Sequence, residues 1–115
     1  MSGDEPKSRG QVSQCLQNLY MQKRLECKIT GLVQGVMFRD FVKRSAQRLD
    51  LTGTVENRPD GSVFVVAEGK EEDLKKFIPT LRKKPIISRM VASVENIEEK
   101  WSEATGTFPD FQILY

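Results

Sequence analysis

Histidine is absent from the 115-residue chain. Because histidine is the usual general base near neutral pH and a frequent metal ligand, its absence excludes Ser-His-Asp and Cys-His catalysis and every zinc or iron site that requires an imidazole. The chain has only two cysteines, Cys15 and Cys27, and they do not form a CxxC pair. We therefore expect two free thiols in a reducing compartment, with no metal and no redox-active disulfide.

Long apolar runs and a strong charge bias are also missing. Lys and Arg number 18 against 16 Asp and Glu, and 38% of the residues are hydrophobic, which is typical of one soluble globular domain. The N-terminal segment lacks the apolar core of roughly 7–15 residues that a secretion signal needs, so the sequence predicts a cytoplasmic protein with no membrane segment. The nearly balanced charge provides no long-range attraction to nucleic acid.

Residues 1–24 differ in composition from the rest and are interpreted as an N-terminal extension before a domain at residues 25–115. This segment has the spacing of an amphipathic helix, whose apolar face would consist of Val12, Cys15, Leu16, Leu19 and Tyr20. An isolated helix of roughly 12 residues is marginal in water. A disordered segment or a short helix without chemistry is therefore favoured over a partner-binding helix.

From residue 25 onward, strand and helix patterns alternate. Strands are expected at Leu25–Thr30, Gly53–Asn57, Ser62–Glu68, Ile87–Asn96 and Phe111–Tyr115. One helix should begin at Phe38 and another at Glu71, with a kink or break at Pro79. The resulting βαββαβ order predicts an α+β domain in which two helices cover one face of an antiparallel sheet.

The loop between the first strand and the first helix, Gly31–Met37, is the best candidate for chemistry. A loop that leads into a helix can direct unpaired backbone N–H groups and the positive end of the helix dipole at one anion. Arg39, in the first turn, could contact two phosphoryl oxygens with its planar guanidinium group. The Gly31 and Gly35 spacing matches neither a P-loop nor a Rossmann motif, so by spacing alone a purely structural turn is favoured.

Two segments carry a family resemblance. Residues 29–39, ITGLVQGVMFR, and residues 53–69, which begin GTVENRPDGSV, resemble the two signatures of the acylphosphatase family. The resemblance covers residues 25–115 and implies a ferredoxin-like sandwich. Thr54 and Glu56 depart from the family pattern, but in a strand they face away from the side of Asn57.

The resemblance implies an enzyme that hydrolyses an acyl phosphate to a carboxylate and inorganic phosphate, without a metal or cofactor. The phosphoryl oxygens would be held by backbone N–H groups of Gln34, Gly35, Val36, Met37 and Phe38. Arg39 would neutralise their charge, and Asn57 would hold the attacking water. Such chemistry depends mainly on positioning and charge stabilisation, which suits a protein without histidine. We expect a monomer that acts on a small molecule and has phosphate as its product or inhibitor.

Other interpretations remain open. Arg39 could be a solvated charge paired with Asp40 or Asp60, Asn57 could be an Asx-turn residue, and Gln34 could close the loop by bonding backbone. The whole domain could be a catalytically idle binding or regulatory module of the same fold. A nucleic-acid-binding module is disfavoured, because the strand at residues 62–68 lacks the aromatic and glycine pattern of an RNA-recognition domain.

Overall fold

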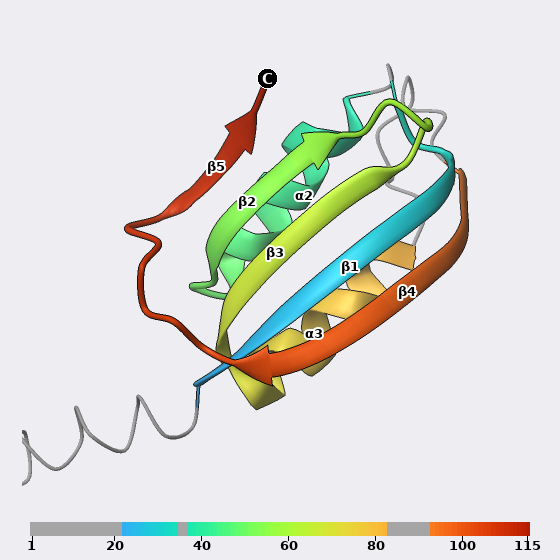
Figure 1. Cartoon of the computed structure of the whole chain (residues 1–115). Helices are drawn as coiled ribbons and strands as arrows, with labels where there is room; N and C mark the ends of the chain where they lie inside the picture. The colour runs from blue at the N-terminus through green and yellow to red at the C-terminus, as the bar shows by residue number, and fades with distance from the viewer. Residues whose placement is uncertain (1–21, 35–36, 83–92) are drawn as a thin grey trace, which may run out of the picture.

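The computed structural model describes residues 22–34, 37–82 and 93–115. In chain order its elements are β1 (Gln22–Leu32), α2 (Phe38–Arg48), β2 (Thr52–Asn57), β3 (Val63–Lys70), α3 (Glu71–Arg82), β4 (Ser93–Glu103) and β5 (Phe111–Leu114) (Figure 1). This order confirms the expected βαββαβ arrangement with a short final strand. The expected helical stripe at residues 12–20, together with Cys15, Gly35 and Val36, lies outside the described residues.

The strands form a single sheet in the order β4-β1-β3-β2-β5. Neighbouring strands from β4 to β2 are antiparallel, whereas β5 runs parallel to β2, with Phe111 opposite Gly53. The expectation of a wholly antiparallel sheet is therefore wrong for its last strand. The chain after β4 reaches β5 at the end of the sheet where β2 begins, and Gly53 donates its backbone N–H to Asp110 there at 2.9 Å. Figure 1 shows β2 and β5 pointing the same way.

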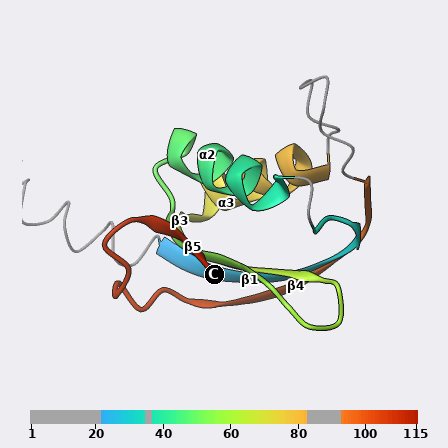
Figure 2. The same cartoon turned by 90° about the horizontal axis from the view of Figure 1, so that it is seen from above.

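Both helices pack on the same face of the sheet, as Figure 2 shows in edge view. The buried apolar side chains alternate along the strands and recur at helical spacing in α2 and α3, as expected for a two-layer α+β domain. The largest fully buried side chains include Phe38 of α2, Phe77 of α3 and Phe111 of β5, and the last two rings lie 6.5 Å apart. The core thus fixes the first turn of α2 against the sheet.

Strand β1 is longer than predicted at both ends. It begins at Gln22, before the expected domain start at residue 25, and extends through Gly31 to Leu32. Gly31 has a φ of 129°, and a Cβ atom there would lie 2.2 Å from the carbonyl oxygen of Ser93. Glycine therefore permits the close approach of β4 at the irregular step in the ladder between Thr30 and Gly31.

The predicted positions of β4 and of the break in α3 also need correction. The strand runs from Ser93 to Glu103, not from Ile87 to Asn96, and residues 87–92 lie outside the described ranges. Its charged, exposed second half has little apolar alternation because it forms an edge of the sheet. Helix α3 is a single element with Pro79 inside it. Pro79 is exposed and close to the C-terminal end of α3, so its missing N–H removes one hydrogen bond without dividing the helix.

No helix within the described ranges is long and apolar enough to span a lipid bilayer.

Candidate active site

Met37 gives the start of α2 an unusual backbone geometry. It is the N-cap residue, with φ 61° and ψ 22° in the left-handed region, and among the described residues no side-chain hydrogen bond caps the helix. The first helical hydrogen bond runs from the N–H of Phe41 to the carbonyl of Met37 at 3.2 Å. The N–H groups of the first turn are therefore available to an external acceptor, at the positive end of the helix dipole. A left-handed non-glycine residue costs about 1–2 kcal/mol, and such strain is frequent at functional sites.

Phe38 anchors this helix end, whereas Met37 is exposed to solvent. The Phe38 side chain is 1% exposed, and its ring centroid lies 6.0 Å from that of Phe41. Met37 is 72% exposed. The burial of Phe38 therefore fixes the direction of the neighbouring N–H groups.

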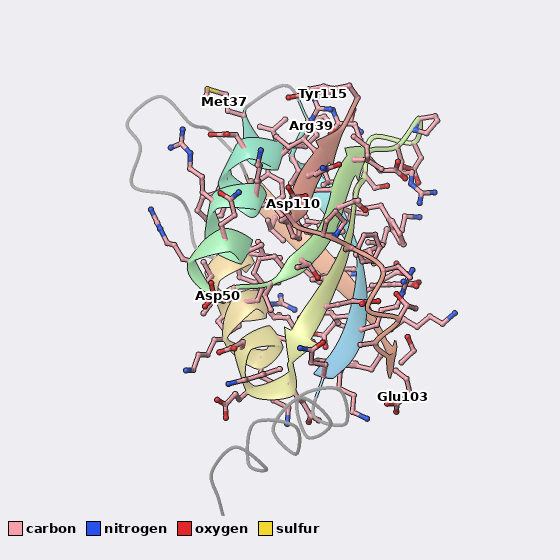
Figure 3. The ribbon with its side chains drawn as sticks, turned by 90° about the vertical axis from the view of Figure 1, so that its left-hand side faces the viewer. Met37, Arg39, Asp50, Glu103, Asp110 and Tyr115 are labelled. Carbon is pink, nitrogen blue, oxygen red and sulfur yellow. The ribbon has the colours of Figure 1, made fainter. Side chains whose placement is uncertain are left out.

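Arg39 is held by the C-terminal strand. Its Nη1 donates a hydrogen bond to the carbonyl oxygen of Leu114 at 3.2 Å, and its guanidinium carbon lies 4.9 Å from the centroid of the Tyr115 ring. Leu114 is the register partner of Glu56 in β2, so these contacts place Arg39 near the end of β2. Figure 3 shows Met37, Arg39 and Tyr115 at the same end of the molecule.

The ion pairs of the alternative interpretation of Arg39, with Asp40 or Asp60, are not found among the described residues. Asp40 pairs with Arg44 at 2.9 Å, one turn along α2, and Asp60 pairs with Lys28 at 3.2 Å. Arg39 instead contacts a neutral carbonyl and an aromatic ring. Its positive charge is therefore not neutralised by a carboxylate in the part of the chain that the structure describes.

Asn57 is the last residue of β2 and lies opposite Val63. It has the same strand parity as the buried residues Gly53 and Val55, so its side chain is on the helix side of the sheet. Its Oδ1 atom is buried and accepts no hydrogen bond from any group in the described ranges. Such an acceptor is well suited to a water molecule or a ligand hydroxyl.

The side chain that closes the turn after β2 belongs to Asp60, not to Asn57. Asp60 Oδ1 accepts hydrogen bonds from the backbone N–H and the hydroxyl of Ser62, at 3.0 and 2.5 Å. The Asx-turn interpretation of Asn57 is therefore not supported. Thr54 and Glu56 have the opposite parity to Asn57, and Glu56 pairs with Arg58 at 2.7 Å.

Gln34 links the loop after β1 to this same turn. Its Nε2 donates to the carbonyl oxygens of Arg58 and Ser62, at 2.8 and 2.7 Å. The side chain thus bonds backbone, as in the alternative interpretation of Gln34, and only its backbone N–H could serve an anion. Gly35 and Val36, the next two predicted phosphate ligands, lie outside the described residues.

Three separate elements therefore meet at one end of the domain: the start of α2, the end of β2 and the loop after β1. The sequence did not predict the support of Arg39 by Leu114 and Tyr115, because the register of a short parallel edge strand has no local signal. The residues at 22–34, 37–82 and 93–115 contain no cluster of three His, Cys, Asp or Glu side chains that could hold a metal ion.

Known proteins resemble this chain over the same region. The family model described as Acylphosphatase matches residues 25–113. An acylphosphatase of Paenarthrobacter aurescens is 46% identical over 91 residues, which cover 79% of this chain and 93% of that protein. An acylphosphatase of Salinibacter ruber is 42% identical over 92 residues, covering 80% and 93% of the two chains. The crystal structure of the Bacillus subtilis acylphosphatase superposes with a TM-score of 0.73 at 32% identity and covers 81% of this chain and 99% of that one.

Proposed function

The chain belongs to the acylphosphatase family, and from this membership we propose the part that each residue of the site plays in acyl phosphate hydrolysis. The enzyme is an acylphosphatase, a hydrolase that cleaves the carboxyl–phosphate bond of a small acyl phosphate to a carboxylate and inorganic phosphate. The observation that best supports the assignment of residues is the convergence of the open helix start, the cation of Arg39 and the buried acceptor of Asn57.

The phosphoryl group binds at the start of α2. The backbone N–H groups from Gln34 to Phe38 donate hydrogen bonds to its oxygens, with the helix dipole adding favourable electrostatics. Arg39 approaches from the side of β5 and donates N–H groups to the same oxygens, which neutralises charge as the transition state forms. The contact with Leu114 occupies Nη1, so the remaining guanidinium donors can face the phosphoryl group.

Asn57 holds the attacking water in line with the bond that breaks. Its Oδ1 accepts a hydrogen bond from that water, whose oxygen attacks phosphorus while the bond from phosphorus to the acyl oxygen breaks. The carboxylate departs with the bonding electrons, and a phosphoryl oxygen takes the proton that the water loses. No side-chain base is required, because an anhydride has a good leaving group and catalysis of phosphoryl transfer relies mainly on positioning and charge stabilisation.

The reaction as proposed uses no metal and no cofactor, and phosphate acts as product and competitive inhibitor. The enzyme works as a monomer on a small molecule, in the cytoplasm, with Cys27 as a free thiol. Neither a membrane nor a nucleic acid takes part in this scheme.

A hydrolysis assay on benzoyl phosphate in the presence of EDTA tests the proposal. We expect turnover that EDTA leaves unchanged and that inorganic phosphate inhibits competitively. Phosphate binding without turnover would indicate a catalytically idle module of the same fold. Loss of activity with EDTA, restored by a divalent cation, would overturn the metal-independent mechanism.

A further inference from the structure

The turn that follows Asn57 has a dense set of hydrogen bonds for an exposed loop. The backbone N–H of Arg58 donates to the carbonyl of Ser62 at 2.8 Å, and that of Gly61 donates to the carbonyl of Arg58 at 3.1 Å. Ser62 is 2% exposed, although Arg58, Asp60 and Gly61 beside it are exposed. Ser62 therefore fixes the turn to the body of the domain.

The carboxylate of Asp60 is the centre of this arrangement. One of its oxygens accepts both hydrogen bonds from Ser62, and the other lies 3.2 Å from Nζ of Lys28 in β1. The bonds from the Ser62 hydroxyl and backbone N–H, with the ammonium of Lys28, hold the pKa of Asp60 well below its usual range. Asp60 is therefore ionised at neutral pH and acts only as an acceptor.

Gln34 connects this turn to the phosphate loop. Its side-chain amide donates to two carbonyls, those of Arg58 and Ser62, which lie at the two ends of the turn. The carbonyl of Ser62 thus accepts from Gln34 and from Arg58 at the same time. The path from Asp60 through Ser62 to Gln34 is continuous and consists of hydrogen bonds of 2.5 to 3.0 Å.

We propose that Asp60 is a positioning residue for catalysis, which through Ser62 and Gln34 fixes the phosphate loop relative to Asn57. This inference rests on the proposed function. The phosphoryl group binds on the loop and α2, whereas the water is held from β2, and the chain between them is long. Within the described residues, the Asp60–Ser62–Gln34 path and the bond from Gln34 to the Arg58 carbonyl link the phosphate loop to the turn beside Asn57.

A purely structural role would lead to different measurements. The side chains of Lys28 and Asp60 are 44% and 54% exposed, so their ion pair contributes little to stability. Loosening the path leaves each half of the site intact, so phosphate binding persists. The alignment of water with phosphorus is lost, however, and a misplacement of about 1 Å can lower the rate on the order of a hundredfold.

The test compares Asp60→Ala with Asp60→Asn, which keeps an acceptor for Ser62. We expect Asp60→Ala to lower kcat by about tenfold or more, with the inhibition constant of inorganic phosphate within about twofold of wild type. Asp60→Asn should recover most of the lost kcat. Glu72→Ala, which removes an exposed carboxylate of α3 far from the turn, is the matched control and should leave kcat unchanged.

A double variant separates this inference from the proposed function. If Asp60 serves to align the phosphate loop with the water held by Asn57, that alignment has no value once Asn57 is removed, and adding Asp60→Ala to Asn57→Ala causes little further loss of kcat. Three results would overturn the inference while wild-type hydrolysis still stood. They are a kcat of Asp60→Ala within twofold of wild type, an inhibition constant of phosphate that changes as much as kcat does, or a double variant whose loss of kcat equals the product of the two single losses. If Asp60→Ala does not fold, Gln34→Ala breaks the same path and must give the same pattern of lower kcat with unchanged phosphate inhibition. Absence of wild-type hydrolysis would instead refute the proposed function.

Discussion

Arg39 and Leu114 are joined by a hydrogen bond from Nη1 to the backbone carbonyl at 3.2 Å, although 75 positions separate them in sequence. The short parallel strand β5 thereby positions a cation that belongs to the first turn of α2. A backbone acceptor orients the guanidinium group without neutralising its charge. The positive charge needed for an anionic substrate is thus preserved while the side chain is held in place.

Replacement of Arg39 by lysine should weaken phosphate binding while the fold is retained. An ammonium group cannot reproduce a planar pair of donors, and the loss of a charge-assisted hydrogen bond of about 1.5–3 kcal/mol corresponds to roughly ten- to a hundredfold in affinity. Phosphate inhibition of benzoyl phosphate hydrolysis measures the effect. Arg44→Lys, on the exposed side of the same helix, is the control, and wild-type inhibition in Arg39→Lys would contradict the role of Arg39.

Replacement of Asn57 by alanine should lower kcat far more than phosphate affinity. In the proposed mechanism Asn57 orients a neutral water, and losing that orientation would cost on the order of a hundredfold in rate. Steady-state kinetics with phosphate as inhibitor separate the two quantities. Thermal unfolding of the variant should change little, because the turn is closed by Asp60. A kcat within a few-fold of wild type would show that the water is held by another group.

Glu68 should contribute strongly to the stability of the fold, and its contribution should decrease as the pH falls. Its side chain, 2% exposed, accepts hydrogen bonds from Arg24 Nη1 and from Thr105 and Gly106 in the connection to β5. Burial raises the pKa of Glu68, but the hydrogen bonds from Thr105, Gly106 and Arg24 outweigh it, so the net pKa is lowered. We expect Glu68→Ala to reduce the free energy of unfolding by about 3–5 kcal/mol at pH 7.

The sign of the pH effect follows from the lowered pKa. The stabilisation by Glu68 is fully present above the pKa of an ordinary glutamate and is lost as the pH falls through the lower folded-state value. Urea unfolding at pH 7 and below pH 4 measures it. Glu68→Gln should lose less stability than wild type over this acid range, and an equal loss in both proteins would assign the effect to other carboxylates.

Cys27 should be inert to thiol reagents in the native protein. Burial, with a smaller effect of Glu99, raises the pKa of this thiol to about 12, so almost no thiolate exists at pH 8. Titration with a thiol-specific reagent in a Cys15→Ser background should show no fast reaction until urea is added. Rapid modification without denaturant would mean that β1 opens readily.

The start of β1 predicts different effects for two truncations. Deletion of residues 1–21 leaves β1 whole, whereas deletion of residues 1–24 also removes Lys23 and Arg24, which pair with Glu103 and Glu68. We expect the shorter deletion to keep activity and melting temperature, and the longer one to melt at least several degrees lower, because the buried Glu68 loses a charged partner. Calorimetry of both proteins measures their melting temperatures. Equal melting temperatures would exclude a structural role for Arg24.

The layers of the fold were predicted from the sequence, and the residues of the candidate site, which stay a prediction, came from the family resemblance; the contacts around them were not predicted. Helix and strand faces have strong local patterns, because burial imposes a period of two in strands and 3.6 in helices. The parallel pairing of β5, the extension of β4 to Glu103 and the left-handed Met37 depend on tertiary contacts instead. The assignment of the turn to Asp60 rather than Asn57 likewise required side-chain geometry.

The most direct test of the mechanism is the fate of oxygen-18 when benzoyl phosphate is hydrolysed in labelled water with EDTA present. Attack on phosphorus by a water held by Asn57 must place one labelled oxygen in the inorganic phosphate and none in the benzoate. Mass spectrometry of both products shows which of them carries the labelled oxygen. Label in the benzoate would show attack at the carbonyl carbon and would contradict the account of Arg39 and Asn57 given above.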